Sequence, residues 1–371
     1  MKEMHGIIFA YSSNIRLKEL TERRTASSIP FGGRYRMIDF MLSNMVNAGI
    51  NDVGVIMHES YQSLLDHLGS GKDWDLSRKR GGLRLLPPFS YASARGAPDF
   101  RGHMEALYGV ASYISRIKQD YVIMADGDIV ANLPVEEIFD FHEKNGADIT
   151  CVISSRRFDD SDNAPYVLAG ADGKVVDVVL GHRQEGYRDT LDTYIMSKQL
   201  LENLMQHCSA HNLYSFRRDV LQQMTDKLNI MAYMFDGYCC HIDSLTSYFQ
   251  HSMDLLEPSV RAQLFNRARP IKTKVRDEAS TYYGPDCIIR NSVVADGCYI
   301  EGTVENSILF RGVKIEAEAT IKNSILMQDT TVRRGVELNY AITDKEVLVN
   351  TGRMLVGHAS YPITISKGST V

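Results

Sequence analysis

The fold of this 371-residue chain is easiest to read in residues 288–338, IIRNSVVADGCYIEGTVENSILFRGVKIEAEATIKNSILMQDTTVRRGVEL. Apolar residues recur at every sixth position in three sets, and Asn-Ser precedes an apolar pair three times. The sets are Ile288, Val294 and Ile300; Leu309, Ile315 and Ile321; and Leu326, Val332 and Leu338. Repeated six-residue steps are typical of a left-handed parallel β-helix, whose coils stack their inward residues on one another. Strands of a β-sandwich also favour β-branched residues, but they do not explain this spacing.

The sequence before residue 258 follows a different pattern. Apolar runs at 7–10, 53–57, 121–124 and 148–154 alternate with helical spacing at 37–48, 61–68, 104–118 and 135–144. A hairpin at 166–180 and helical patterns at 197–207, 216–228 and 243–256 follow. Continuously apolar strands alternating with helices predict a doubly wound, Rossmann-like α/β fold with a buried parallel sheet. We therefore expect an α/β domain over 1–258, a linker over 259–287 and the left-handed β-helix over 288–371.

Composition and charge narrow the function classes. The 41 Lys and Arg residues against 46 Asp and Glu give a net charge of −5, which offers no electrostatic case for nucleic-acid binding. No run approaches the roughly 18 apolar residues that cross a bilayer, and the first residues lack the features of a signal peptide. We expect a cytoplasmic protein that binds no membrane. The six cysteines show no C-x-x-C spacing, so free thiols are expected rather than a zinc site.

A nucleotide-binding βα unit usually carries a glycine-rich loop after its first strand. Here residues 7–21 read IIFAYSSNIRLKELT, and the turn Tyr11-Ser12-Ser13-Asn14 contains no glycine. Glycine lets the backbone approach a phosphate closely, whereas Tyr11 and Ser12 place Cβ atoms in that space. We interpret the segment as the remnant of a phosphate loop.

The stretch FGGRYRMIDFMLSN at 31–44 resembles the signature of the ADP-glucose pyrophosphorylases, the glucose-1-phosphate adenylyltransferases of bacterial glycogen synthesis. The resemblance continues through DFRGHMEALYGVA at 99–111, YVIMADGDIV at 121–130 and NSVVADGC at 291–298, and so covers nearly the whole chain. It implies a nucleotidyltransferase domain followed by the β-helix. It also implies a reaction in which ATP and glucose 1-phosphate give ADP-glucose and pyrophosphate, with Mg²⁺ on the phosphates.

The sequence departs from the family pattern where the chemistry is expected. The loop Ala-Gly-Gly-x-Gly-Thr-Arg-Leu has become AYSSNIRL at 10–17, in which Arg16 keeps its match. Ala26 stands in place of an active-site lysine, and Ser215 in place of a metal-binding aspartate. The segment VVLGH at 178–182 lacks the lysine that holds the sugar phosphate. The resemblance thus marks a degenerate site at Tyr11, Ser12, Asn14, Arg16, Ala26, Gly127 and Ser215.

The central aspartate of the family motif Ala-Gly-Asp-His falls on Gly127 when ADGDI at 125–129 is aligned without a gap. A slip of one residue would bring Asp128 onto the motif, but such a slip at a strand end turns side chains to the opposite face. Asp126 and Asp128 therefore have two interpretations. They are either solvated or helix-capping carboxylates, or a pair that binds a cation.

Basic residues also match the allosteric anion site that this family has at the junction of its two domains. The resemblance assigns effector binding to Arg23, Arg24, Arg36 and, after the coils, Lys345. Forked cationic side chains of this kind suit a sugar phosphate. The alternative is that Arg23 and Arg24 form solvated ion pairs with acidic residues one helical turn away.

These departures resemble the noncatalytic (GlgD-type) subunit that pairs with a catalytic pyrophosphorylase subunit. We therefore expect a regulatory chain in a mixed tetramer, with no cofactor of its own and with Mg²⁺ serving the partner's reaction. The alternative is an active, divergent adenylyltransferase that uses Asp126, Asp128 and Arg16 with Mg²⁺. A hexapeptide acyltransferase is a third possibility, disfavoured because no histidine occurs between His251 and His358.

Overall fold

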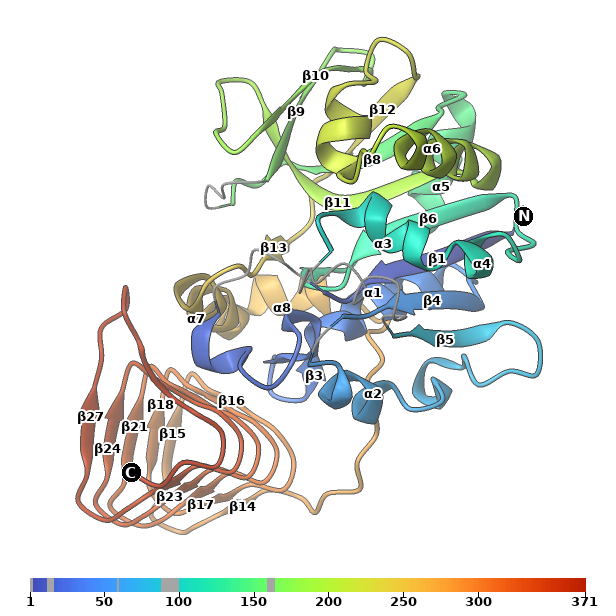
Figure 1. Cartoon of the computed structure of the whole chain (residues 1–371). Helices are drawn as coiled ribbons and strands as arrows, with labels where there is room; N and C mark the ends of the chain where they lie inside the picture. The colour runs from blue at the N-terminus through green and yellow to red at the C-terminus, as the bar shows by residue number, and fades with distance from the viewer. Residues whose placement is uncertain (1–2, 12–16, 59, 88–99, 159–163) are drawn as a thin grey trace.

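The computed structural model describes residues 3–11, 17–58, 60–87, 100–158 and 164–371. An α/β domain is followed by a β-helix, which lies beneath it in Figure 1. Within the described residues, no helix is long and apolar enough to cross a membrane.

The α/β domain is built on a nine-stranded sheet whose longest path runs β10-β9-β11-β6-β1-β4-β5. Its parallel centre consists of β1 (Met4–Phe9), β4 (Asp52–Ile56), β5 (Gly82–Leu86) and β6 (Tyr121–Asp126). Every residue of β1 is buried, as expected for a strand covered on both faces. The doubly wound domain predicted from the alternating pattern is confirmed.

The other half of the sheet is mixed. The long β11 (Arg188–Ser197) runs antiparallel to β6 and to β8 (Ile149–Ser154), and β12 (Ile230–Phe235) pairs in parallel with β8. The predicted hairpin is present as β9 (Pro165–Ala169) and β10 (Val175–Leu180). Smaller pairings join β7 (Ile129–Ala131) to β13 (Cys239–His241), and β2 (Pro30–Phe31) to β3 (Tyr35–Arg36).

Most helices lie where their apolar spacing predicts them. These are α1 (Met37–Asn47), α2 (Gln62–Leu68), α3 (His103–Gly109), α4 (Ala111–Ile114), α5 (Val135–Lys144), α6 (Lys198–Ala210) and α7 (Leu245–Met253), whereas α8 (Pro258–Leu264) was not predicted. The single helix expected over 104–118 is divided at Val110, which follows a glycine and has φ −115° and ψ 22°. The pattern at 216–228 forms η5, a π-helix over Phe216–Gln222.

The β-helix has three parallel five-stranded sheets, one for each side of its triangular coil (Figure 1). The first contains β14 (Tyr282–Tyr283), β17 (Tyr299–Ile300), β20 (Lys314–Ile315), β23 (Thr331–Val332) and β26 (Leu348–Val349). The second contains β15 (Ile288–Arg290), β18 (Thr303–Glu305), β21 (Thr320–Lys322), β24 (Glu337–Asn339) and β27 (Met354–Val356). The third contains β16 (Val293–Val294), β19 (Ile308–Leu309), β22 (Ile325–Leu326), β25 (Ala341–Thr343) and β28 (Ile363–Ile365). The predicted left-handed parallel β-helix is confirmed.

One position of the hexad prediction is wrong. Ile288 is 45% exposed, and its neighbour Ile289 instead packs against the interior of the coil. Ile288 pairs with Thr303, whereas Ile289 pairs with the fully buried Val304. The buried residue of this side and that of the next are five positions apart in each coil, as from Val304 to Leu309 and from Ile321 to Leu326. A count of six back from Val294 therefore reaches Ile288 and misses Ile289.

The Asn-Ser repeats form one corner of the coil. Asn291, Asn306 and Asn323 all have positive φ, a conformation that asparagine tolerates better than most residues. The following serines form a ladder, in which Ser292 Oγ accepts from Ser307 N and Ser307 Oγ accepts from Ser324 N. The repeat is therefore a turn requirement as well as a core pattern.

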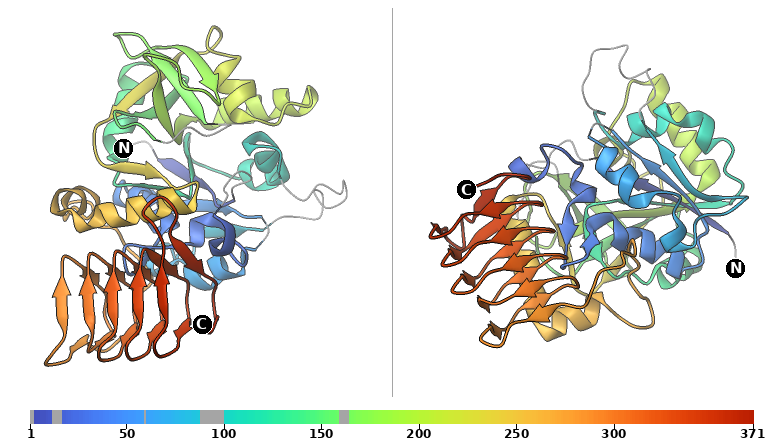
Figure 2. Two further views of the ribbon diagram at one scale, coloured as in Figure 1. Left: turned by 90° about the vertical axis from the view of Figure 1, so that its left-hand side faces the viewer. Right: turned by 90° about the horizontal axis from the view of Figure 1, so that it is seen from below.

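The two domains share a hydrophobic core. Phe249, Leu255 and Leu264, from the segment of α7 and α8, belong to the same buried cluster as Ile308 and Phe310 of the coils. Figure 2 shows these helices directly above the stacked coils. The segment assigned to a linker is partly regular, since α8 occupies its start and β14 near its end already belongs to the first coil. Elsewhere it runs along the α/β domain, where Ser43 Oγ accepts from Lys272 N.

Candidate functional site

The first candidate site lies at the carboxyl edge of the parallel strands, where open α/β sheets bind ligands. Asp126 is the last residue of β6, in register with Phe9 at the end of β1. Its side chain contacts two basic groups, since His103 Nε2 lies 3.0 Å from Oδ1 and Arg217 Nη2 lies 3.0 Å from Oδ2. Burial alone would raise the pKa of Asp126, but His103 and Arg217 hold that pKa below its usual value.

Arg217 is the central cation of this site. It also contacts Asp192 of β11, through Nε to Oδ1 at 2.9 Å and Nη2 to Oδ2 at 2.8 Å. Burial alone would lower the pKa of the guanidinium, but the carboxylates of Asp192 and Asp126 outweigh it and raise that pKa. Ser215, in the position of the family's metal-binding aspartate, is the N-cap of η5, where its Oγ accepts from Arg218 N. That position therefore has a local structural role.

Asp128 lies beside this ion-pair network without joining it closely. Burial, together with the charges of Asp126 and Asp192, raises the pKa of Asp128 to about 6 against an opposing effect from His241. Its Oδ2 is 3.9 Å from His241 Nε2, and its Oδ1 has no hydrogen-bond partner among the described residues. Of the described part of the chain, no group of three or more His, Cys, Asp or Glu side chains is arranged to hold a metal ion.

The space around Gly127 is small. Its backbone N–H donates to Phe9 O, and a Cβ atom added there would lie 2.8 Å from Ser27 Oγ and 3.2 Å from Ile8 Cγ2. An aspartate at this position would require Ser27 to move. Ala26, in place of the family's lysine, is buried in the core shared by the two domains.

Aromatic side chains fill the region next to the first strand. The Tyr11 ring lies 5.0 Å from that of Phe100 and 6.1 Å from that of His103, which stacks on Phe9 at 4.0 Å. Burial, reinforced by the charge of Asp126, raises the pKa of Tyr11 well above its ordinary value. Ser12, Asn14 and Arg16, the other predicted loop residues, lie outside the described residues.

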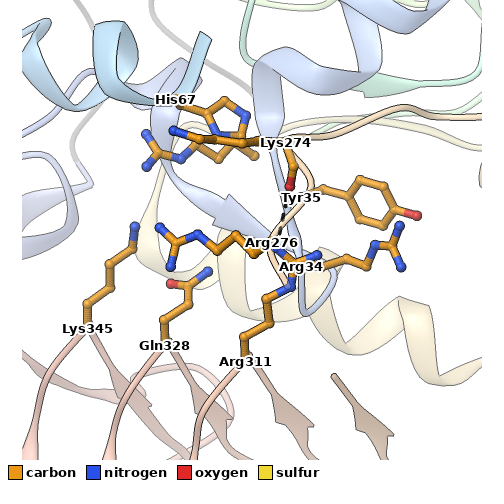
Figure 3. Close-up of a pocket in the computed structure, with 9 residues that line it drawn as sticks. Arg34, Tyr35, His67, Lys274, Arg276, Arg311, Gln328 and Lys345 are labelled. Carbon is orange, nitrogen blue, oxygen red and sulfur yellow. Dashed lines mark hydrogen bonds between the residues drawn. The ribbon is translucent and has the colours of Figure 1, made fainter. Parts of the chain in front are cut away.

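The second candidate site is a cationic pocket between the two domains (Figure 3). It is lined by Arg34, Tyr35, Arg36, His67, Lys274, Arg276, Arg311, Gln328 and Lys345. Arg311, Gln328 and Lys345 extend from the β-helix, and Figure 3 shows them rising from successive coils toward Arg276 and Arg34. Among the described residues no carboxylate lines this pocket, and its charge is positive although Arg311 Nε pairs with Asp296 Oδ1 at 3.1 Å.

The coil repeat places the β-helix side chains. Each follows by two residues the end of β19, β22 or β25, strands that pair in register as Leu309, Leu326 and Thr343. Arg311, Gln328 and Lys345 are therefore equivalent positions on three stacked coils. On the opposite side, Arg36 is the N-cap of α1 and donates through Nη1 to Ser63 O at 2.6 Å.

The predicted effector residues separate into two groups. Arg36 and Lys345 both line the pocket. Arg24 is buried beside it in an ion pair, with Nη2 2.6 Å from Asp344 Oδ2, so its charge is already balanced. Arg23 is exposed and does not line the pocket. The alternative that both arginines form solvated ion pairs is therefore wrong for Arg24, which is 4% exposed.

Burial and neighbouring positive charges lower the pKa values of two basic side chains in the pocket. Burial, followed by the charges of Arg36 and Arg24, lowers the pKa of Lys345 to about 7. Burial also lowers the pKa of Arg36 to about 10, with contributions from Arg24 and Arg276. A site with this unbalanced positive charge would be stabilised by an anion, which supplies the missing countercharge.

Sequence reasoning missed Arg34, Lys274, Arg276, Arg311 and Arg217. A signal for two of them was present in IKTKVR at 271–276, where basic residues alternate in an extended segment. Alternation places them on one face of the chain. Arg311 could have been found from its spacing to Lys345, which equals two coils. Nothing local distinguishes Arg217 from its neighbour Arg218.

Comparisons with known proteins agree with this architecture. A family model described as nucleotidyl transferase matches residues 5–257, and one described as GlmU-like, C-terminal hexapeptide matches residues 277–360. The glycogen biosynthesis protein GlgD of Bacillus subtilis (strain 168) is 35% identical over 99% of this chain and 96% of its own length. The chain belongs to the family of GlgD proteins and glucose-1-phosphate adenylyltransferases.

Other members of the family are similar over somewhat less of the chain. GlgD of Geobacillus stearothermophilus is 37% identical over 86% of this chain and 83% of its own length. The glucose-1-phosphate adenylyltransferase of the same organism is 31% identical over the same shares. The cationic pocket combines residues from both family-matched segments, and Lys274 and Arg276 lie in or at the edge of the gap between them.

Proposed function

We propose that this chain is a regulatory, catalytically impaired subunit of ADP-glucose pyrophosphorylase in glycogen biosynthesis. It would act in a mixed tetramer on a catalytic partner subunit, which makes ADP-glucose and pyrophosphate from ATP and glucose 1-phosphate with Mg²⁺. Relatives named as glycogen biosynthesis proteins and as glucose-1-phosphate adenylyltransferases support this assignment. In this cytoplasmic role the chain needs no cofactor of its own and binds neither nucleic acid nor a membrane.

One observation carries the proposal: side chains of the protein itself occupy the candidate nucleotide site. Arg217 pairs with Asp126 and Asp192, and the Tyr11 ring packs against Phe100 and His103. Adenylyl transfer depends on cations and backbone N–H groups that contact the phosphates in the transition state. Carboxylates already paired with a guanidinium are poorly placed to hold a metal–triphosphate complex.

The cationic pocket supports the regulatory half of the proposal. Arg34, Arg36 and Arg276 can each present two N–H groups to a phosphate, and Lys345 adds a fourth positive charge. We infer that the pocket takes an anionic effector, with a sugar phosphate as the best match to its charge. Because the lining comes from both domains, a bound anion would fix the β-helix against the α/β domain.

Regulation then follows from association. An effector that binds one arrangement of the two domains better than another shifts the equilibrium by its difference in affinity. If the partner's active state prefers the same arrangement, the coupling free energy would be about 1–3 kcal/mol. A coupling of that size corresponds to a change of roughly 5- to 150-fold in the affinity of one site when the other is occupied.

The experiment is pyrophosphate release from ATP, glucose 1-phosphate and Mg²⁺, measured on this chain, on the catalytic subunit and on their mixture. We expect no turnover by this chain alone, and faster turnover or an altered response to glucose 6-phosphate in the mixture. Arg276→Gln should weaken that response, while the matched surface variant Arg290→Gln should not. A mixture that behaves as the catalytic subunit alone would refute the regulatory role.

The carboxylate of Asp128 provides a test of the alternative function, an active enzyme. Asp128 has an oxygen without a hydrogen-bond partner among the described residues, which favours an active, divergent adenylyltransferase that would use Asp126 and Asp128 with Mg²⁺. That enzyme would turn over by itself and lose activity in Asp128→Asn. A regulatory subunit should stimulate its partner equally well with either residue.

A further inference from the structure

Two departures from regular backbone structure meet at Arg217. Asp192 has φ +40°, unusual for a residue other than glycine, at the place where the register between β11 and β8 shifts. Arg217 itself lies in the first turn of η5, a π-helix over Phe216–Gln222. Both features are uncommon, and both tend to persist where the surrounding contacts demand them. Here the contact that joins them is the ion pair between Arg217 and Asp192.

The geometry resembles the coordination of a cation. Arg217 Nη2 lies 3.0 Å from Asp126 Oδ2 and 2.8 Å from Asp192 Oδ2, so one nitrogen holds two carboxylates from different strands. Asp192 Oδ1 accepts from Arg217 Nε at 2.9 Å and from the Tyr194 hydroxyl at 2.8 Å. The arginine side chain is 21% exposed, and both carboxylates are below 10%.

The buried carboxylates around Arg217 require a cation to balance their negative charge. Asp126, Asp128 and Asp192 are all buried, and each ionised carboxylate removed from water costs several kcal/mol unless it is paired. Asp128 is 4% exposed and has an oxygen without a hydrogen-bond partner among the described residues, so it adds a further buried carboxyl near the pair. With Arg217 in place, the described carboxylates are not arranged as a set of three metal ligands. Carboxylate oxygens are also the ligands that Mg²⁺ and Mn²⁺ prefer.

We propose that Arg217 is a resident cation that takes the place of a divalent metal ion between Asp126 and Asp192. The native site is closed to such an ion because its charge is already balanced from within the chain. Removal of the guanidinium leaves a carboxylate cluster that binds Mn²⁺ or Mg²⁺. This inference concerns the chain alone and holds whether or not the chain regulates a partner.

The test measures Mn²⁺ binding to the full chain by electron paramagnetic resonance, with isothermal titration as a second readout. Wild type should bind no Mn²⁺ at this site, whereas Arg217→Ala and Arg217→Gln should each bind one equivalent. Adding Asp192→Asn to either variant should weaken that binding at least about tenfold. The glutamine variant keeps the side chain as far as Cδ and some hydrogen-bonding capacity, so it serves if the alanine variant is not obtained folded.

Thermal unfolding gives an independent readout. At about ten times its dissociation constant, Mn²⁺ should raise the Tm of Arg217→Gln by about 3 °C and leave the wild-type Tm unchanged. Guanidinium ion at millimolar concentration should also stabilise Arg217→Ala, which leaves space for it, while K⁺ at equal ionic strength should not. Folded Arg217 variants that bind no Mn²⁺, or wild type that binds it as tightly as they do, would overturn the proposal. Neither result would bear on stimulation of a partner subunit, which the pyrophosphate assay tests separately.

Discussion

The guanidinium of Arg24 and the carboxylate of Asp344 are joined by two hydrogen bonds of 2.8 and 2.6 Å, although 320 positions separate them in the chain. Both side chains are buried, with 4% and 1% of their surfaces exposed. Asp344 Oδ1 also accepts from Lys345 N at 2.7 Å. The pair therefore connects the α/β domain to the β-helix directly beside the cationic pocket, and it sets the position of a residue that lines it.

Breaking this pair should destabilise the contact between the domains. Asp344→Ala leaves a buried guanidinium without its partner, and such losses typically cost about 3–5 kcal/mol. We expect the unfolding transition to split into two, because the domains would no longer unfold together. Differential scanning calorimetry measures this directly. Glu305→Ala, which removes its surface ion pairs with Arg290 and Lys322, is the control and should cost less than about 1 kcal/mol. An equal loss in both variants would contradict the role assigned to the buried pair.

Anion binding in the pocket should depend on pH through Lys345. Its pKa is lowered to about 7, so above that pH the free pocket contains a neutral amine. A bound anion favours the charged form, and binding then takes up a proton. Affinity should therefore fall above pH 7, by up to about tenfold per pH unit. Sulfate is the appropriate probe for isothermal titration, because it does not titrate in this range.

Variants that remove one lysine charge at a time provide the controls for this prediction. Lys345→Gln should bind sulfate more weakly at pH 6.5 and lose most of the dependence between pH 7 and 8.5. Lys322→Gln, at an exposed position on β21, should bind as wild type. His67 also lines the pocket, but its pKa is lowered mainly by burial, so it contributes only below the range tested. A pH slope that survives in Lys345→Gln would place the titrating group elsewhere.

Asp128 should lower the stability of the protein at neutral and alkaline pH. Its folded-state pKa is raised to about 6 from an ordinary value of 3.8, so the native state holds a proton that the unfolded state releases earlier. Stability therefore declines as pH rises from about 4 to 6, and the full penalty remains above that range. Asp128→Asn should add about 1–3 kcal/mol at pH 8 and nothing at pH 4.

Urea unfolding at the two pH values measures this difference. Asp75→Asn is a suitable control, because that carboxylate is on the surface and pairs with Lys272. A gain for Asp128→Asn that is the same at pH 4 and pH 8 would mean that packing, not ionisation, is responsible.

The interior of the β-helix should distinguish two isoleucines that look alike in the sequence. Ile321 is fully buried and stacks between Val304 and Leu338 of the neighbouring coils, whereas Ile288 is 45% exposed. Ile321→Ala should cost about 2–5 kcal/mol, because it leaves a cavity that the flanking coils cannot close. Ile288→Ala removes the same atoms from the surface, so it should cost less than about 1 kcal/mol. The midpoints of urea unfolding of the two variants, compared with wild type, test this assignment. An equal loss of stability in both would mean that Ile288 is buried as the hexad pattern predicted.

The amino-acid sequence by itself determined both fold classes. The hexads predict the β-helix and the strand–helix alternation predicts the α/β domain, because each pattern reflects a local period that one face of an element must satisfy. Prediction worked best in the middle of the β-helix, where Leu309, Ile315 and Ile321 are all buried as expected. It failed at Ile288, because the buried residues of that side and the next, Ile289 and Val294, are five positions apart and not six.

Only the tertiary structure decided what the candidate sites contain. The sequence predicted Arg36 and Lys345 through a family resemblance, but the pocket is completed by Arg34, Lys274, Arg276 and Arg311, which lie in distant segments. Likewise, the loss of a metal-binding aspartate at Ser215 was visible in the sequence, whereas the guanidinium of Arg217 between Asp126 and Asp192 was not. Periodicity is a local property that can be recognised in the sequence alone. Charge balance in a buried site depends on which distant side chains the fold brings within a few ångströms, and that is set by packing.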